Sequence, residues 1–126
     1  MEIGKTASVT TIVTEANTAK TVGSGSLAVF ATPMMIALME KAACECLTEA
    51  LTDEQTSVGT QITVEHTAAT PIGAEITATA VIEYVSGRKI EFAITANDGR
   101  VDIGKGKHTR FIVDRERFIL KAEAAR

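Results

Sequence analysis

Aromatic residues and cysteines are scarce in this sequence. The 126-residue chain has no tryptophan, one tyrosine and four phenylalanines, and its two cysteines are Cys44 and Cys46. Two residues apart on a helix, these side chains point about 200° away from each other, so they neither chelate a metal together nor readily form a disulfide. Two prolines and nine glycines exclude a collagen-like or low-complexity chain. We therefore expect reduced thiols inside a globular domain.

Long apolar runs and an excess of positive charge are also missing. The longest strongly apolar stretch, residues 33–39, is far shorter than the ~20 residues that span a membrane. The N-terminal residues lack the basic flank and apolar region of a secretory signal. Lys and Arg number 13 and Asp and Glu number 16, which gives a formal net charge of -3, and the basic residues are scattered. We therefore expect a cytoplasmic protein that binds neither membranes nor nucleic acid.

The periodicity of the apolar residues predicts one helix and five strands. With 45% hydrophobic residues, a chain of this length can build one core but not two, so residues 1–126 are expected to form a single domain. The predicted elements are a strand over 7–14, a polar loop over 16–26, a helix over about 33–51, and strands over 57–66, 74–85, 89–97 and 101–113. This order predicts an α+β fold in which a curled antiparallel sheet wraps around one long central helix.

Three polar residues stand where apolar side chains are expected. Glu40 lies on the apolar side of the predicted helix, and Thr32 precedes Pro33 at its start, where it is expected to cap the helix. Strict alternation in strand 57–66 places His66 on the face that carries Val58. Each residue has an ordinary explanation, namely a rim carboxylate, an N-cap and a buried core histidine. Together they indicate a pocket in which a hydroxyl, a carboxylate and an imidazole converge.

The familiar catalytic motifs are absent, namely a phosphate-binding loop with its lysine, a GxSxG elbow, an HExxH helix and a CxxC pair. The spacing of several segments instead resembles the hotdog-fold thioesterases of the fluoroacetyl-CoA thioesterase type. The segments that carry the resemblance are residues 23–27, 31–35, 38–43, 57–60, 64–66, 69–73 and 104–111.

The resemblance implies a hotdog fold, a homodimer or a dimer of such dimers, and an acyl-CoA substrate hydrolysed without a metal or organic cofactor. The residues that match the family's catalytic positions are Thr32, Glu40 and His66, and those that match positions near its substrate are Gly59, Arg110 and Phe30. Phe30 is the one phenylalanine in residues 13–31, whereas the family's specialised lid is rich in phenylalanine. The sequence therefore does not predict fluoroacetyl specificity.

Several functions are compatible with these residues. In a thioesterase, Glu40 would either attack the thioester carbonyl or deprotonate a water molecule, and His66 would orient the base or protonate the leaving thiolate. Thr32 would donate a hydrogen bond to the carboxylate or to the carbonyl oxygen. The alternatives are an acyl-CoA-binding or sensing module without turnover, and an enoyl-CoA hydratase of the same fold.

Overall fold

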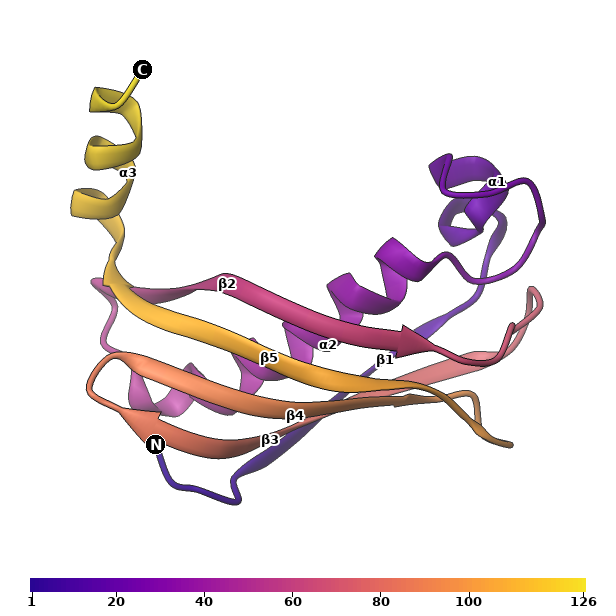
Figure 1. Cartoon of the computed structure of the whole chain (residues 1–126), viewed down its shortest axis with the longest axis horizontal. Coiled ribbons are helices and arrows are strands. Elements are labelled where there is room, and N and C mark those ends of the chain that lie inside the picture. Colours follow the sequence, from indigo (N-terminus) through magenta and orange to yellow (C-terminus); the bar gives the residue numbers. More distant parts are fainter.

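A five-stranded antiparallel sheet curls around one long helix in the computed structural model, which describes residues 1–126 (Figure 1). The strand order across the sheet is β1-β3-β4-β5-β2, and every neighbouring pair is antiparallel. This arrangement confirms the predicted α+β class. The strands are β1 (Thr6–Ile12), β2 (Gln55–His66), β3 (Glu75–Ser86), β4 (Lys89–Asn97) and β5 (Asp102–Asp114), and the α-helices are α1 (Ala19–Val22), α2 (Thr32–Leu47) and α3 (Arg115–Ala124).

The central helix α2 differs from its prediction at both ends. It begins at Thr32 and ends at Leu47, and a short 3-10 helix, Thr48–Ala50, follows it. Pro33 lies in the first turn, where a missing N–H leaves no helical hydrogen bond unmade. The N-cap is Ala31, which provides no side-chain cap, so the expectation that Thr32 caps the helix is wrong. Because Thr32 is already helical, its hydroxyl is available to another partner.

The hydrophobic core lies between α2 and the inner face of the sheet. The helix packs mainly against β1 and β3, and residues such as Met35 and Met39 are fully buried. A Cβ atom on Gly104 of β5 would lie 2.5 Å from Sδ of Met35, so the bare backbone lets the helix approach, as the sequence predicts. Gly106 serves a different neighbour, because its added Cβ would collide with the backbone of β2.

A β-bulge changes which side chains of β2 face the helix. The register with β5 slips between Gly59 and Gln61 and leaves Thr60 unpaired. One extra residue reverses the alternation of side chains along a strand. Ser57 and Gly59 therefore lie on the same inner face as His66. Strict alternation places these two residues on the face opposite to His66, so that prediction is wrong.

The segment between β1 and α2 is polar and is held by side-chain hydrogen bonds. It contains a 3-10 helix, Glu15–Asn17, and the short α1, neither of which the sequence predicts. The amide of Asn17 donates to the carbonyl of Ile12 at 3.0 Å, and its oxygen accepts from the backbone N–H of Thr14 at 2.9 Å. Phe30, at the end of this segment, is 1% exposed and belongs to the hydrophobic core.

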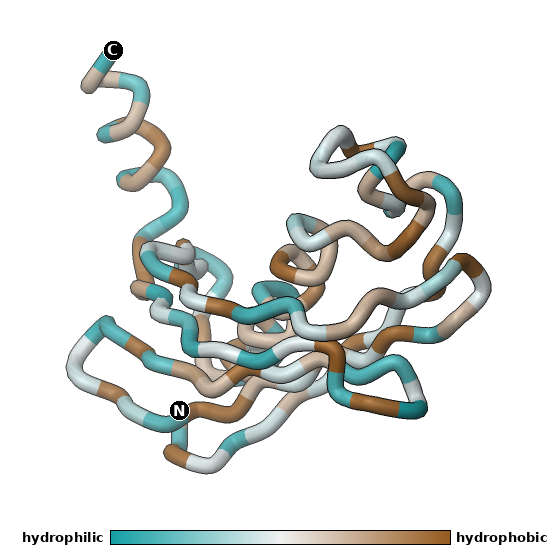
Figure 2. Tube along the Cα trace, turned by 45° about the vertical axis from the view of Figure 1, so that its right-hand side comes forward, coloured by the Kyte–Doolittle hydropathy of each residue, from teal (hydrophilic) through white to brown (hydrophobic).

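The two outer strands of the sheet, β1 and β2, and the last helix leave surfaces uncovered within the chain. Strand β2 is an edge strand, hydrogen-bonded to β5 on one side. Helix α3 projects away from the sheet beyond the end of β5 (Figure 1), and part of it is coloured as hydrophobic in Figure 2. Its large apolar residues Phe118, Ile119 and Leu120 are exposed. None of the α-helices combines the length and the apolar character needed to cross a membrane.

Candidate active site

Polar side chains meet the apolar interior at two places along α2. Thr32 is the first residue of the helix, and Glu40 lies eight residues later, about 12 Å along the helix axis. Strand β2 runs beside both positions, with His66 next to Thr32 and Gly59 next to Glu40. The residues that the sequence singles out therefore form two groups, one at each position.

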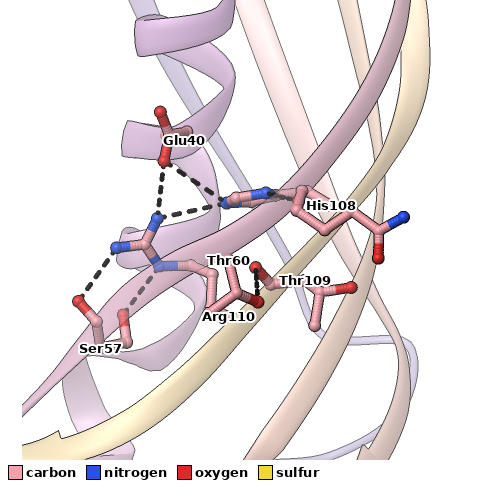
Figure 3. A network of polar contacts seen from close by, with 7 residues as sticks. Glu40, Ser57, Thr60, His108, Thr109 and Arg110 are labelled. Atoms are coloured by element: carbon pink, nitrogen blue, oxygen red, sulfur yellow. Dashed lines mark hydrogen bonds and ion pairs between the residues drawn. The ribbon is translucent and has the colours of Figure 1, made fainter.

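Glu40 is held through one of its two carboxylate oxygens (Figure 3). Nη1 of Arg110 donates a hydrogen bond to Oε2 of Glu40 at 3.1 Å. The arginine side chain is 8% exposed, whereas the glutamate side chain is 39% exposed. No hydrogen bond or ion pair engages Oε1, which points away from the arginine in Figure 3. The carboxylate thus has one oxygen tied to a buried cation and one oxygen free.

Arg110 is fixed from three elements at once. Its Nε donates to the hydroxyl of Ser57 at 2.8 Å, and its Nη2 donates to the carbonyl of Ser57 at 3.0 Å. Its Nη1 lies 3.2 Å from Nε2 of His108 in addition to its contact with Glu40. A buried guanidinium is stable only when its charge and its N–H donors are paired, and four of the five donors are paired here. Arg110 therefore positions the carboxylate.

Gly59 has no side chain and so lets the backbone of β2 lie close to this carboxylate. A Cβ atom at this position would lie 2.6 Å from Oε2 of Glu40 and 3.1 Å from both Nη1 of Arg110 and Cε1 of His108. The bulge at Thr60 turns the glycine toward the helix, so a side chain here would strike the ion pair. The edge strand therefore presents bare backbone where the carboxylate reaches the surface.

Thr32 and His66 form the second group. Oγ1 of Thr32 lies 2.7 Å from Nδ1 of His66, within hydrogen-bond distance. Burial lowers the pKa of His66, and the backbone of Ala68 acts in the opposite direction. Nε2 of His66 is buried and has no hydrogen-bond partner. A buried polar atom without a partner is uncommon and is a position where a substrate, a water or another chain can bind.

The predicted convergence of all three catalytic candidates does not occur within one chain. Thr32 contacts His66, but neither contacts Glu40. The imidazole beside the carboxylate is that of His108, whose Nε2 lies 3.8 Å from Oε2 of Glu40. Within the single chain, His66 therefore does not adjoin Glu40, because the register of β5 against β2 places a different histidine there.

Two residues of the Glu40 group were not among the predicted site residues, His108 and Ser57. His108 lies two positions before Arg110 on β5, and residues two apart on a strand share a face, so this spacing was a usable signal. Ser57 gave no such signal, because strict alternation placed it on the other face. Phe30, predicted near the substrate, is packed in the hydrophobic core.

Comparison with known proteins gives a consistent result. Residues 13–116 match the family model described as fluoroacetyl-CoA-specific thioesterase. The curated fluoroacetyl-CoA thioesterase of Streptantibioticus cattleyicolor is 42% identical over 93 residues, which are 74% of this chain and 67% of that protein.

Solved structures agree with the sequence comparison. A variant of the fluoroacetyl-CoA-specific thioesterase FlK is 32% identical with a TM-score of 0.94, covering 100% of this chain and 98% of that chain. Its complex with fluoroacetate and CoA is 34% identical with a TM-score of 0.89, covering 94% and 99%. A hot-dog-like protein from Thermanaerovibrio acidaminovorans is 19% identical with a TM-score of 0.89, covering 99% and 93%. These similarities confirm the hotdog fold.

Proposed function

Because the chain belongs to the fluoroacetyl-CoA-specific thioesterase family, we propose that it hydrolyses the thioester bond of a small acyl-CoA. The observation that supports the proposal is how the carboxylate of Glu40 is held. One carboxylate oxygen is bound by Arg110, the other is free, and Gly59 leaves the approach to them bare. An oriented carboxylate in such a position can act on a carbonyl carbon directly or through water.

The reaction needs one carboxylate, one proton donor and one water molecule. In the direct route, Oε1 of Glu40 bonds to the carbonyl carbon, the carbon–sulfur bond breaks, and CoA leaves as a thiolate that takes up a proton. Water then hydrolyses the mixed anhydride and restores Glu40. In the indirect route, Glu40 accepts a proton from water while the water oxygen attacks the same carbon. Both routes release the acid and CoA, and neither requires a metal or an organic cofactor.

The pair formed by Thr32 and His66 supplies the hydrogen-bonding group for this reaction. The hydroxyl of Thr32 orients the ring through Nδ1, which leaves the buried Nε2 of His66 as the nitrogen without a protein partner. We infer that this nitrogen forms a hydrogen bond with the carbonyl oxygen or the sulfur of the substrate. Burial lowers the pKa of His66, which favours the neutral ring near pH 7. When Nε2 donates to the substrate, Nδ1 accepts the hydrogen bond from the hydroxyl of Thr32.

A homodimer fits both the edge strand and the separation of the two groups. A 12-residue edge strand such as β2 presents unpaired backbone groups that readily pair with another strand. Antiparallel pairing of β2 with the β2 strand of a second copy, around a two-fold axis, would bring the His66 end of one strand beside the Gly59 end of the other. Each site would then combine Glu40 of one chain with Thr32 and His66 of the other. Light scattering at micromolar concentration should show a dimer, and a stable monomer would contradict this assembly.

The substrate class is a small acyl-CoA rather than fluoroacetyl-CoA in particular. The segment before α2 carries polar side chains, and its one phenylalanine, Phe30, is buried in the core. We also place the enzyme in the cytoplasm, where acyl-CoA esters are formed and used. Fractionation of cells that express the tagged protein tests that location.

A panel of acyl-CoA thioesters with a thiol-detecting reagent tests the activity. We expect release of free CoA from acetyl-, propionyl- or butyryl-CoA by purified, folded protein. Saturable binding without thiol release would identify a sensing module instead. Loss of the enoyl absorbance of a short enoyl-CoA without thiol release would identify a hydratase.

A further inference from the structure

His108 is the most completely enclosed ionisable side chain near Glu40. It lies on the inner face of β5, is 2% exposed, and stacks on Phe92 of β4 with ring centroids 6.0 Å apart and an interplanar angle of 29°. Its ring is enclosed, with Nη1 of Arg110 3.2 Å from Nε2 and the backbone of Gly59 close to Cε1. Any contribution to the reaction must therefore act through a neighbouring group.

The neighbours of the ring define its tautomer. Nδ1 of His108 lies 2.8 Å from the carbonyl oxygen of Gln61, which can only accept, so Nδ1 carries the hydrogen. Nε2 lies 3.2 Å from Nη1 of Arg110, which can only donate, so Nε2 presents its lone pair. The ring that satisfies both contacts is neutral and protonated at Nδ1.

The charges around the ring favour this neutral form. Burial is the main cause that lowers the pKa of His108, and the guanidinium of Arg110 lowers it further. The carbonyl of Gln61 and the carboxylate of Glu40 raise the pKa but do not outweigh burial. These are the charged and titratable groups that face the ring: Arg110 from β5 itself and Glu40 from α2, whereas β2 contributes a carbonyl and β4 contributes the ring of Phe92.

We propose that His108 is a positioning residue of the thioesterase site, and that its neutral Nε2 holds Nη1 of Arg110 against Oε2 of Glu40. This proposal rests on the proposed function. Nη1 donates one hydrogen to the imidazole and one to the carboxylate, so its orientation is fully determined. An imidazolium at this position would remove the acceptor and set two cations 3.2 Å apart. Protonation of His108 would therefore release Arg110 from its place and with it the orientation of Glu40.

Two substitutions separate positioning from packing. In His108→Asn, the amide nitrogen takes the place of Nδ1 and still donates to Gln61, but nothing accepts from Arg110. In His108→Gln, the longer side chain carries an amide oxygen to the place of Nε2, so the acceptor is kept without a titrating group. Thr109→Val, on the opposite face of the same strand, is the control for changes in β5 that leave the ring in place.

We expect His108→Asn to lower kcat roughly tenfold or more with little change in KM, the scale of a misplaced catalytic group. His108→Gln should keep kcat within a few-fold of wild type near pH 7 and lose the acidic limb of the rate profile that His108 causes. Equal kcat in His108→Asn and wild type would overturn the proposal. An unchanged acidic limb in His108→Gln would also overturn it, and this second result decides the matter if His108→Asn does not fold.

A measurement without substrate separates this proposal from the proposed function. Nitrogen-15 NMR of the imidazole rings reports which nitrogen carries the hydrogen, and we expect the neutral form protonated at Nδ1 for His108 at pH 7 in wild type. Detection of the imidazolium or of the other neutral form would overturn the positioning role even in an active enzyme. If the expected form is found but no acyl-CoA is hydrolysed, the proposed function fails while the arrangement of His108, Arg110 and Glu40 stands.

Discussion

A Cβ atom on Gly59 would lie 2.6 Å from Oε2 of Glu40. Real Cβ atoms do not approach an oxygen so closely, so the carboxylate occupies the space that a side chain at Gly59 would need. The glycine is at ordinary backbone angles, and its role is therefore close approach and not conformational freedom. Strand β2 and helix α2 can lie this close together because Gly59 has no Cβ atom.

Gly59→Ala should displace the carboxylate without unfolding the protein. The added methyl group would lie 2.6 Å from Oε2 of Glu40, a half-exposed side chain that can move aside. Its contacts with Nη1 of Arg110 and Cε1 of His108, both at 3.1 Å, require shifts of only a few tenths of an ångström. A shift of about 1 Å in a catalytic group can cost about a hundredfold in rate, and we expect a loss of that order in kcat. Gly25→Ala is the matched control, since its nearest neighbour would be a side-chain atom 3.3 Å away. Wild-type kcat in Gly59→Ala would show that the close approach of the Gly59 backbone to Glu40 is not needed for the reaction.

Glu40→Gln should lower kcat by roughly a hundredfold or more, because the amide neither attacks a carbonyl nor accepts a proton from water. Its oxygen can still accept a hydrogen bond from Arg110, so the fold should persist, which circular dichroism and a thermal melt would show. Glu45→Gln makes the same chemical change on an exposed position of the same helix and should have no effect on kcat. A near-normal rate in Glu40→Gln would reduce Glu40 to a structural carboxylate.

The order of the elements could be predicted from the sequence because hydrophobic period changes sharply from 3.6 on the helix to 2 on the strands. The fold class followed from that order. The bulge at Thr60 could not be predicted, because no apolar side chain between Val58 and Ile62 marks the change of face. The faces of Ser57 and Gly59 were therefore assigned wrongly.

The sequence singles out part of the candidate site, but not Ser57, His108 or the contacts between the residues. Glu40, Gly59 and Arg110 do lie together, as do Thr32 and His66. Which histidine adjoins Glu40 depends on the register between β2 and β5, a pairing of segments about 50 residues apart that no local pattern records. A threonine before Pro33 suggests an N-cap in most sequences, and here its hydroxyl bonds to a strand instead.

The hydroxyl of Thr32 can be tested with a pair of substitutions of similar size. Thr32→Ser keeps the hydrogen bond to Nδ1 of His66, whereas Thr32→Val keeps the shape and removes the hydroxyl. A hydrogen bond of this kind contributes about 1 kcal/mol, so we expect kcat to fall severalfold to about tenfold in Thr32→Val and to change little in Thr32→Ser. Steady-state kinetics on the best acyl-CoA substrate measures both. Equal rates in the two variants would contradict a role for the hydroxyl.

Stability should decrease in mild acid because two histidines are buried in the neutral form. Burial lowers the pKa of His66 and His108 below 6.5, so the unfolded chain binds more protons than the folded one as the pH falls below that value. The stabilisation is complete above pH 6.5 and is lost through the lowered pKa values. Thermal melts should show a falling Tm in this window and a smaller fall in His108→Gln. Asp98, whose pKa is lowered from 3.8 by backbone N–H groups, contributes in a separate and more acidic window.

Mixing two inactive variants tests whether each active site is built from two chains. In a mixed dimer of Glu40→Gln and His66→Ala, a site that takes Glu40 from one chain and His66 from the other is intact on one side and doubly altered on the other. Random association makes half of the dimers mixed, so refolding the two variants together should restore about a quarter of the wild-type activity. Each variant refolded alone is the control and should stay inactive. No recovery, with mixed dimers demonstrated by mass spectrometry, would mean that Glu40 and His66 of one chain act together, and a movement of α2 or β2 would then be needed to bring them into contact.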